Sequence, residues 1–236
     1  GGGGRREAVV TEAEAAVLAN EVRALFTHAY DSYMQHAYPH DELQPVSCAG
    51  EDFGPTAGNM LTLIDSLDTL AVMGNATAFK DGVRRVAALH RGFGADINVS
   101  VFETTIRIMG GLLSAHLLAS DAGAYPDTFM PDYNGRLLEL ATDLGERLLP
   151  AFETRTGIPY GTVNLLRGVP RGETPIASLA GAGSLSLEFQ LLTELTALPK
   201  FGRAARRAVS ALYRRRNEVT GLLGKHINVT SGTWTE

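Results

Sequence analysis

Acidic side chains interrupt three segments of the sequence that are otherwise almost entirely apolar. They are Asp65 and Asp68 in residues 60–74, Glu103 in residues 101–119 and Glu188 in LSLEFQLL (185–192) of the segment 183–198. Burying an ionised carboxylate is costly unless the group is paired. Because each of three similar segments carries such a group, we expect the acids to converge on a shared polar cavity.

Carboxylates that share a cavity are suited to glycoside hydrolysis. In that reaction one carboxylic acid protonates the leaving oxygen, while a second carboxylate activates water or attacks the sugar. A transition-metal site would usually add His or Cys. His36 and His40 are four residues apart, but Pro39 between them breaks the helical geometry that would align them. The G-x-S-x-G and phosphate-loop patterns are absent from the sequence.

A purely structural role stays open for each acid. Arg107 follows Glu103 by four residues, so the two could form an ion pair within one helix. Asp65 could cap a neighbouring helix, and Glu188 could bond a loop backbone. A helical scaffold with structural acids is therefore an alternative to a catalytic site.

The segments that carry the acids predict helices, and each is followed by a helix of a second kind. The first kind is apolar on all sides, and the second is apolar on one face. The pairs are 60–74 with 78–90, 101–119 with 136–152, and 183–198 with 201–216. This alternation is typical of an inner ring of helices wrapped by an outer ring. It predicts an all-α toroid, and the uneven spacing disfavours a solenoid of stacked hairpins.

Two further segments complete the expected fold. Residues 14–38 predict a helix that ends before Pro39. Residues 156–175 are rich in Gly and Pro, and the apolar run at 158–166 predicts a short β-hairpin near 156–170. The polar residues 1–13 predict a flexible N-terminal segment, and we assign 14–236 to one domain.

Composition narrows the class of protein. Of the 236 residues, 44% are apolar and 20% are charged, which is enough apolar material for a substantial core. The net charge of -5 gives no electrostatic case for nucleic-acid binding, and we interpret the arginines of 203–216 as a solvated helix face. No uncharged apolar run reaches the roughly 18–20 residues of a membrane span.

Cysteine and sequon positions bear on the compartment. Cys48 is the single cysteine, so no disulfide can form within the chain. Three N-glycosylation sequons begin at Asn75, Asn98 and Asn228 and favour a secretory route. The chain opens without a signal-peptide pattern and stops abruptly after 228-NVTSGTWTE-236, so we expect it to be a fragment.

Several long motifs stand out: FTHAYDSYMQHAYPHDEL (26–43), LTLIDSLDTLAVMGN (61–75), NVSVFETTIRIMGGLLSAHLL (98–118), TGIPYGTVNL (156–165) and LEFQLLTELT (187–196). They resemble the class I α-mannosidases, a glycoside hydrolase family. The opening HAYDSYM…HAYPHDEL, GIPYGTVNL and 226-HINVTSGTW-234 are most similar to the ER degradation-enhancing branch. The resemblance covers about residues 24–236 and implies an (α/α)7 barrel, of which this chain would be the N-terminal half of the catalytic domain, an incomplete toroid.

The resemblance also implies an activity and a set of site residues. The activity is inverting hydrolysis of terminal α-1,2-linked mannose from N-linked high-mannose glycans in the ER lumen, with a bound Ca²⁺. Glu103 matches the proton donor, Arg107 an active-site arginine, and Asp65 and Glu188 active-site carboxylates. The family's candidate bases and its calcium-anchoring threonine lie beyond Glu236. We therefore expect no metal ligand in this chain and no hydrolysis by the fragment alone.

Two alternatives concern partners rather than fold. A mannose-binding, lectin-like module would recognise high-mannose glycans of misfolded glycoproteins without cleaving them. Cys48 would be able to bridge to a redox partner or a downstream cysteine if the protein is luminal.

Overall fold

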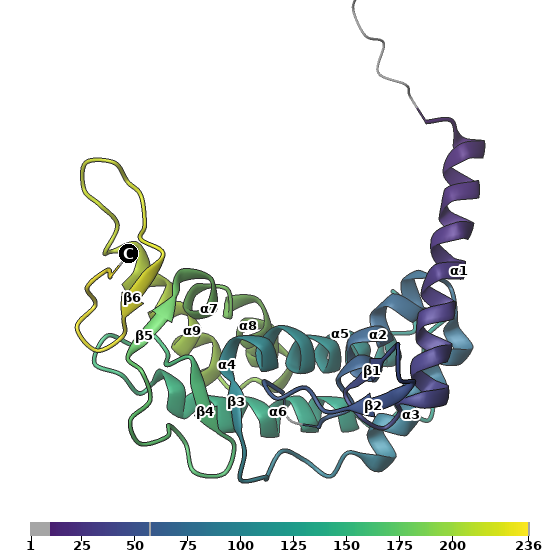
Figure 1. Ribbon diagram of the computed structural model, residues 1–236, viewed down its shortest axis with the longest axis horizontal. Helices are drawn as coiled ribbons and strands as arrows, with labels where there is room; N and C mark the ends of the chain where they lie inside the picture. Colours follow the sequence, from purple (N-terminus) through teal and green to yellow (C-terminus); the bar gives the residue numbers. More distant parts are fainter. Residues whose placement is uncertain (1–9, 57, 236) are drawn as a thin grey trace, which may run out of the picture.

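Helices are the main element of the computed structural model, which describes residues 10–56 and 58–235 (Figure 1). The α-helices are α1 (Glu12–His36), α2 (Leu61–Val72), α3 (Ala76–Leu89), α4 (Val101–Glu103), α5 (Gly110–Ser120), α6 (Arg136–Leu148), α7 (Leu179–Gly183), α8 (Ser186–Thr196) and α9 (Lys200–Tyr213). A π-helix, η1 (Thr104–Met109), joins α4 to α5, and a 3-10 helix, η2 (Leu149–Phe152), follows α6. The ribbon forms an open arc between α1 at one end and the last strands at the other (Figure 1).

The helices pack in two layers, as the alternation predicts. The apolar helices α2, α5 and α8 contact one another in that order, and the amphipathic helices α3, α6 and α9 each pack near their predicted partners. Gly111 allows α5 to approach α2 closely, since a Cβ there would lie 2.7 Å from Ile64 Cγ2 and 2.9 Å from the Ile64 carbonyl oxygen. Leu63, Ile64 and Leu67 are fully buried between the layers.

Three two-stranded antiparallel ladders connect the loops of this arc. They are β1 (Glu42–Gln44) with β2 (Ala49–Glu51), β3 (Asn98–Ser100) with β4 (Thr162–Asn164), and β5 (Ile176–Ser178) with β6 (His226–Asn228). The prediction of a hairpin near 156–170 is wrong about the partner strand. Strand β4 pairs with β3, which lies in a distant part of the chain. Val163 and Val99 are both buried in that ladder, which explains why the apolar run pairs there. Close to β4 in sequence, Asn164 and Gly168 form an isolated antiparallel bridge.

The helix predicted over 101–119 is interrupted. The chain runs through α4, then the π-helical η1, then α5. Thr105 Oγ1 donates to the carbonyl oxygen of Val101 at 2.7 Å, a back-bond that competes with regular helix hydrogen bonding. π-helical turns frequently occur at functional sites.

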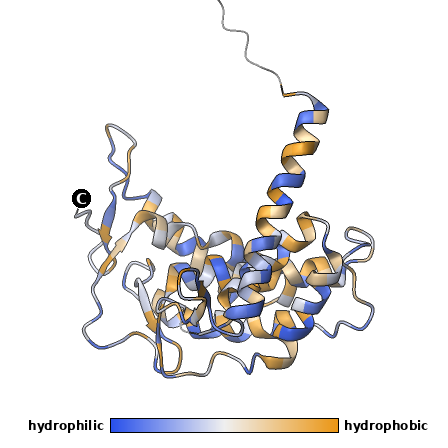
Figure 2. Cartoon of the chain, turned by 45° about the vertical axis from the view of Figure 1, so that its right-hand side comes forward, coloured by the Kyte–Doolittle hydropathy of each residue, from blue (hydrophilic) through white to orange (hydrophobic). Residues whose placement is uncertain are grey.

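Helix α1 extends away from the packed layers. Thr11 and Glu14 form a capping box at its start. Its apolar side chains are largely solvent-exposed, with Val17 at 58% and Leu25 at 70%. Figure 2 shows hydrophobic positions, in orange, along the projecting helix. The flexible segment predicted for residues 1–13 falls mostly outside the described residues. Within the described part of the chain, no helix combines the length and apolar character needed to cross a membrane.

Candidate active site

Arg107 lies between two carboxylates that come from different helices. Its Nε donates to Glu103 Oε2 at 2.7 Å, an (i, i+4) contact from the end of α4 into η1. Its Nη1 lies 3.8 Å from Asp65 Oδ2 on α2. The structure therefore brings together three of the four residues predicted for the site. The predicted ion pair between Glu103 and Arg107 is present, and Arg107 forms a second, longer ion pair with Asp65 across the α2–η1 contact.

Glu188 approaches the same π-helical segment from the other side. It lies in the first turn of α8, and α8 packs against η1. A Cβ placed on Gly110, the residue after η1, would lie 3.8 Å from Glu188 Cγ and 3.9 Å from its Oε1. Both distances are ordinary van der Waals contacts, so Glu188 lies directly beside the junction of η1 and α5. That all four side chains line one cavity remains a prediction.

The surroundings raise the pKa of the carboxyl groups at two of these positions. Burial raises the pKa of Asp65, and the nearby Asp68 and Glu103 raise it further, while Arg107 opposes the shift. Burial also raises the pKa of Glu188. Glu188 Oε2 is buried and has no hydrogen-bond partner among the described residues. Since buried polar atoms are nearly always satisfied, this oxygen is suited to receive a ligand hydroxyl.

Asp68 differs from the other acids of the apolar segments. Ser114 Oγ on α5 donates to Asp68 Oδ2 at 3.1 Å. This bond ties α2 to α5, which gives Asp68 a structural role. Its charge nevertheless reaches the site, because it contributes to the raised pKa of Asp65.

Phe53 is a residue at this site that the sequence reasoning missed. Its ring centroid lies 5.5 Å from Arg107 Cζ, within the range of a cation–π contact. Phe53 lies in the loop between β2 and α2, 54 positions before Arg107 in sequence. No periodic pattern connects residues that far apart. The one signal that could have found Phe53 is the position of its loop between the motifs PHDEL and LTLIDSLDTL.

Neither a metal site nor a disulfide is evident in the described part of the chain. No group of three or more His, Cys, Asp or Glu side chains is arranged there to hold a metal ion. The described residues therefore do not fit the calcium implied by the resemblance. Cys48 is an exposed free thiol.

Comparisons with known proteins agree on one family. The family model for Glycosyl hydrolase family 47 matches residues 25–236. The chain is 51% identical over 223 residues to Alpha-mannosidase I MNS4 of Arabidopsis thaliana, covering 94% of this chain and 35% of that protein. It is 49% identical over 216 residues to the human ER degradation-enhancing alpha-mannosidase-like protein 2, covering 90% of this chain and 36% of that protein.

A more distant relative and a solved structure extend the agreement. Human endoplasmic reticulum mannosyl-oligosaccharide 1,2-alpha-mannosidase is 38% identical over 214 residues, covering 89% of this chain and 28% of that protein. The solved alpha-1,2-mannosidase from Trichoderma reesei superposes with a TM-score of 0.82 at 32% identity, covering 92% of this chain and 45% of that one. The chain therefore spans about a third of the length of MNS4 and of the human ER degradation-enhancing relative.

Proposed function

Because the chain belongs to glycosyl hydrolase family 47, we propose that the protein removes terminal α-1,2-linked mannose from N-linked high-mannose glycans, with inversion. The observation that carries this proposal is the cluster of Glu103, Arg107 and Asp65 on α4, η1 and α2, with Glu188 beside it on α8. Carboxylates grouped in this way supply the acid and charge stabilisation that glycoside hydrolysis requires.

Glu103 is the proposed proton donor. An arginine bonded to a carboxyl group favours its ionised form, which opposes that role. The contact with Arg107 uses only Oε2 of Glu103, however. A proton on Oε1 is therefore compatible with the same hydrogen bond, because the protonated group keeps Oε2 as an acceptor.

Arg107, Asp65 and Glu188 have supporting roles in the proposal. Arg107 holds the carboxyl plane of Glu103, and Asp65 fixes the second side of the guanidinium. Glu188, with its unpartnered buried Oε2, accepts a hydrogen bond from a sugar hydroxyl. Each role uses a contact or an unsatisfied atom of this chain.

We propose that the two helix layers form part of an (α/α)7 barrel and that residues 14–236 belong to one catalytic domain. The likeness to the Trichoderma reesei mannosidase supports this assignment. Residues 1–236 alone are proposed to be inactive, because the resemblance places the catalytic base outside the matched motifs.

The proposed setting is glycoprotein quality control in the ER lumen. The names of two relatives, an ER degradation-enhancing alpha-mannosidase-like protein and an endoplasmic reticulum mannosidase, support it. In this setting the substrates of the protein are high-mannose N-glycans of misfolded glycoproteins. In such an oxidising compartment the exposed thiol of Cys48 is available for exchange with a redox partner.

The test compares Glu103→Gln with Glu139→Gln in the complete protein, using a high-mannose N-glycan and following mannose release by mass spectrometry. Glu139 is a matched control, because it lies on α6 in an exposed pair with Arg136. We expect Glu103→Gln to lower the release rate on the order of 10²–10⁴-fold, the usual contribution of general acid–base catalysis.

The remaining outcomes are equally informative. Unchanged turnover in Glu103→Gln would assign the acid role to another carboxylate. Glycan binding by the wild-type protein without any release would instead identify a mannose-binding module. Detection of the β-anomer as the first product by NMR would confirm inversion.

A further inference from the structure

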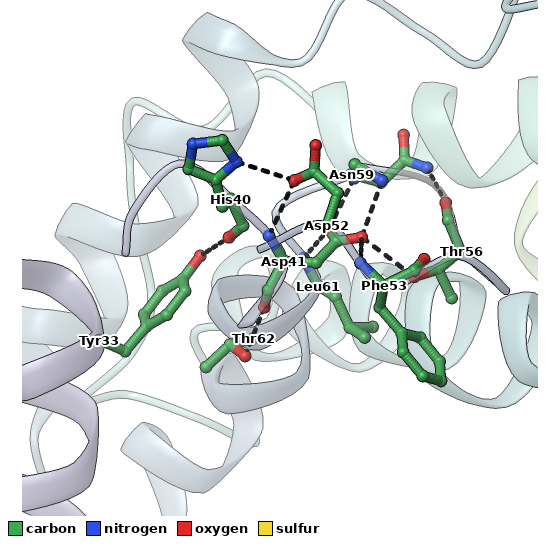
Figure 3. A network of polar contacts seen from close by, with 10 residues as sticks. Tyr33, His40, Asp41, Asp52, Phe53, Thr56, Asn59, Leu61 and Thr62 are labelled. Atoms are coloured by element: carbon green, nitrogen blue, oxygen red, sulfur yellow. Dashed lines mark hydrogen bonds and ion pairs between the residues drawn. The ribbon is translucent and has the colours of Figure 1, made fainter. Parts of the chain in front are cut away.

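Asp41 is a fully buried carboxylate at the centre of a polar network (Figure 3). It belongs to the loop after α1, just before β1, and five hydrogen-bond donors surround its two oxygens. They are the backbone N–H groups of Phe53, Gly58, Asn59 and Leu61, and the hydroxyl of Thr56. In every one of these contacts Asp41 is the acceptor, as a carboxylate requires.

One oxygen of Asp41 caps the start of α2 from outside the helix. The residue before α2, Met60, has a φ of 58° and makes no side-chain capping bond among the described residues. Asp41 Oδ1 instead accepts from the N–H of Asn59 at 2.7 Å and of Leu61 at 2.9 Å. The Asp41 carbonyl oxygen accepts from the N–H of Thr62 at 3.0 Å. A helix N-terminus needs such acceptors and favours a negative charge, so a distant residue replaces the usual cap.

The other oxygen of Asp41 holds the loop that carries Phe53. Oδ2 accepts from the N–H of Phe53 at 3.1 Å and of Gly58 at 2.7 Å. The Phe53 ring faces Arg107, with 5.5 Å from its centroid to Cζ. Asp41 therefore acts on the guanidinium through one intermediate side chain.

The cap of α2 and the position of the Phe53 loop both bear on the contact between Asp65 and Arg107. Asp65 lies four residues after Leu61 on α2, and Arg107 lies against Phe53. The distance of 3.8 Å between Asp65 Oδ2 and Arg107 Nη1 is long for an ion pair. A small shift of either the α2 start or the Phe53 loop would separate the two groups.

We propose that Asp41 is a positioning residue, which fixes Asp65 and Arg107 relative to each other by capping α2 and holding Phe53. It touches none of the proposed reacting groups itself. This inference rests on the proposed function for its effect on turnover, but its geometric part is independent of that function.

The test uses Asp41→Asn in the complete protein, because asparagine keeps the size but replaces one accepting oxygen with an NH₂ group. The control is Ile227→Ala, which removes buried volume in a separate core cluster far from the site in sequence. Turnover of a high-mannose glycan is measured well below the melting temperature of each variant. Amide hydrogen exchange is followed in peptides covering residues 58–66.

For Asp41→Asn we expect faster exchange at the start of α2 and a kcat lowered on the order of 10–100-fold, with KM within about threefold, because misplaced catalytic geometry acts mainly on the chemical step. Ile227→Ala should keep the wild-type kcat, even if its melting temperature falls as far as that of Asp41→Asn. An unchanged kcat in Asp41→Asn, or an equal loss in Ile227→Ala, would overturn the proposal.

Failure of the proposed function is recognised separately. If the wild-type protein releases no mannose, a crystal structure of Asp41→Asn decides the geometric part. A lengthened distance between Asp65 and Arg107 then supports the positioning role, and an unchanged distance refutes it.

Discussion

Acidification should destabilise the fold through His90, at the end of α3. His90 is buried, and both of its ring nitrogens have defined partners. Nδ1 accepts from the N–H of Gly92 at 3.1 Å, so Nε2 carries the proton and faces Asn59 Oδ1 at 3.2 Å. A second proton on Nδ1 would break the bond to Gly92. Burial, helped by the nearby Arg136 and opposed by Asp143, lowers the pKa of His90 to about 4.

The sign and size of the effect follow from that pKa. The folded-state pKa lies below the ordinary value of 6.5, so the unfolded chain binds the proton more tightly. The contribution to stability is fully present above pH 6.5 and is lost as the pH falls toward 4. Between pH 7 and pH 5 the loss is about 2 kcal/mol, a large part of a net stability of roughly 5–15 kcal/mol.

The assay is pulse proteolysis in urea at pH 7 and pH 5, comparing the wild type with His90→Gln. The wild type should lose about 2 kcal/mol more than the variant over this range, because glutamine does not titrate. Acidic groups elsewhere titrate in both proteins and cancel in the difference. Equal losses in the two proteins would refute the argument, and would mean that His90 charges without breaking its contacts.

The remaining predictions concern the α2–η1 contact. Arg107→Lys should lower kcat on the order of 10²-fold, because one ammonium group cannot reproduce the guanidinium geometry toward Glu103 and Asp65; Arg85→Lys, in an exposed pair with Asp81, should leave kcat unchanged. Comparable losses in both would argue against a special role for Arg107. Gly111→Ala should destabilise the fold by about 1–2 kcal/mol, since the overlap with Ile64 outweighs the gain in helix propensity. Urea midpoints should show no such loss for Gly161→Ala, where a Cβ meets nothing within 4 Å.

The helix layers and the Glu103–Arg107 pair were predictable because they depend on short-range periodicity. Side chains three or four residues apart share one face of a helix, so apolar patterns reveal which helices are buried. The same spacing places Arg107 one turn after Glu103, and the structure confirms their hydrogen bond. The family resemblance adds what periodicity lacks, namely a prediction of which acids face the sugar.

Other features depend on residues that no local pattern connects. The β4 strand was predicted as part of a hairpin, but Val163 pairs with Val99 because both side chains are buried there. The π-helical turn at Thr104–Met109 was missed because its residues are equally compatible with a regular α-helix.

The contacts around Arg107 show most clearly which features follow from local patterns and which depend on the folding of distant segments. Local patterns in the sequence predict that Asp65, Glu103 and Arg107 lie on apolar helices, and they allow an ion pair between Glu103 and Arg107. The folding of distant segments against one another brings Asp65 and Phe53 to the same guanidinium and Asp41 to the start of α2. These contacts join segments whose spacing along the chain is set by loops, and a loop's path is fixed by hydrogen bonds such as those of Asp41 rather than by any repeating pattern of side chains.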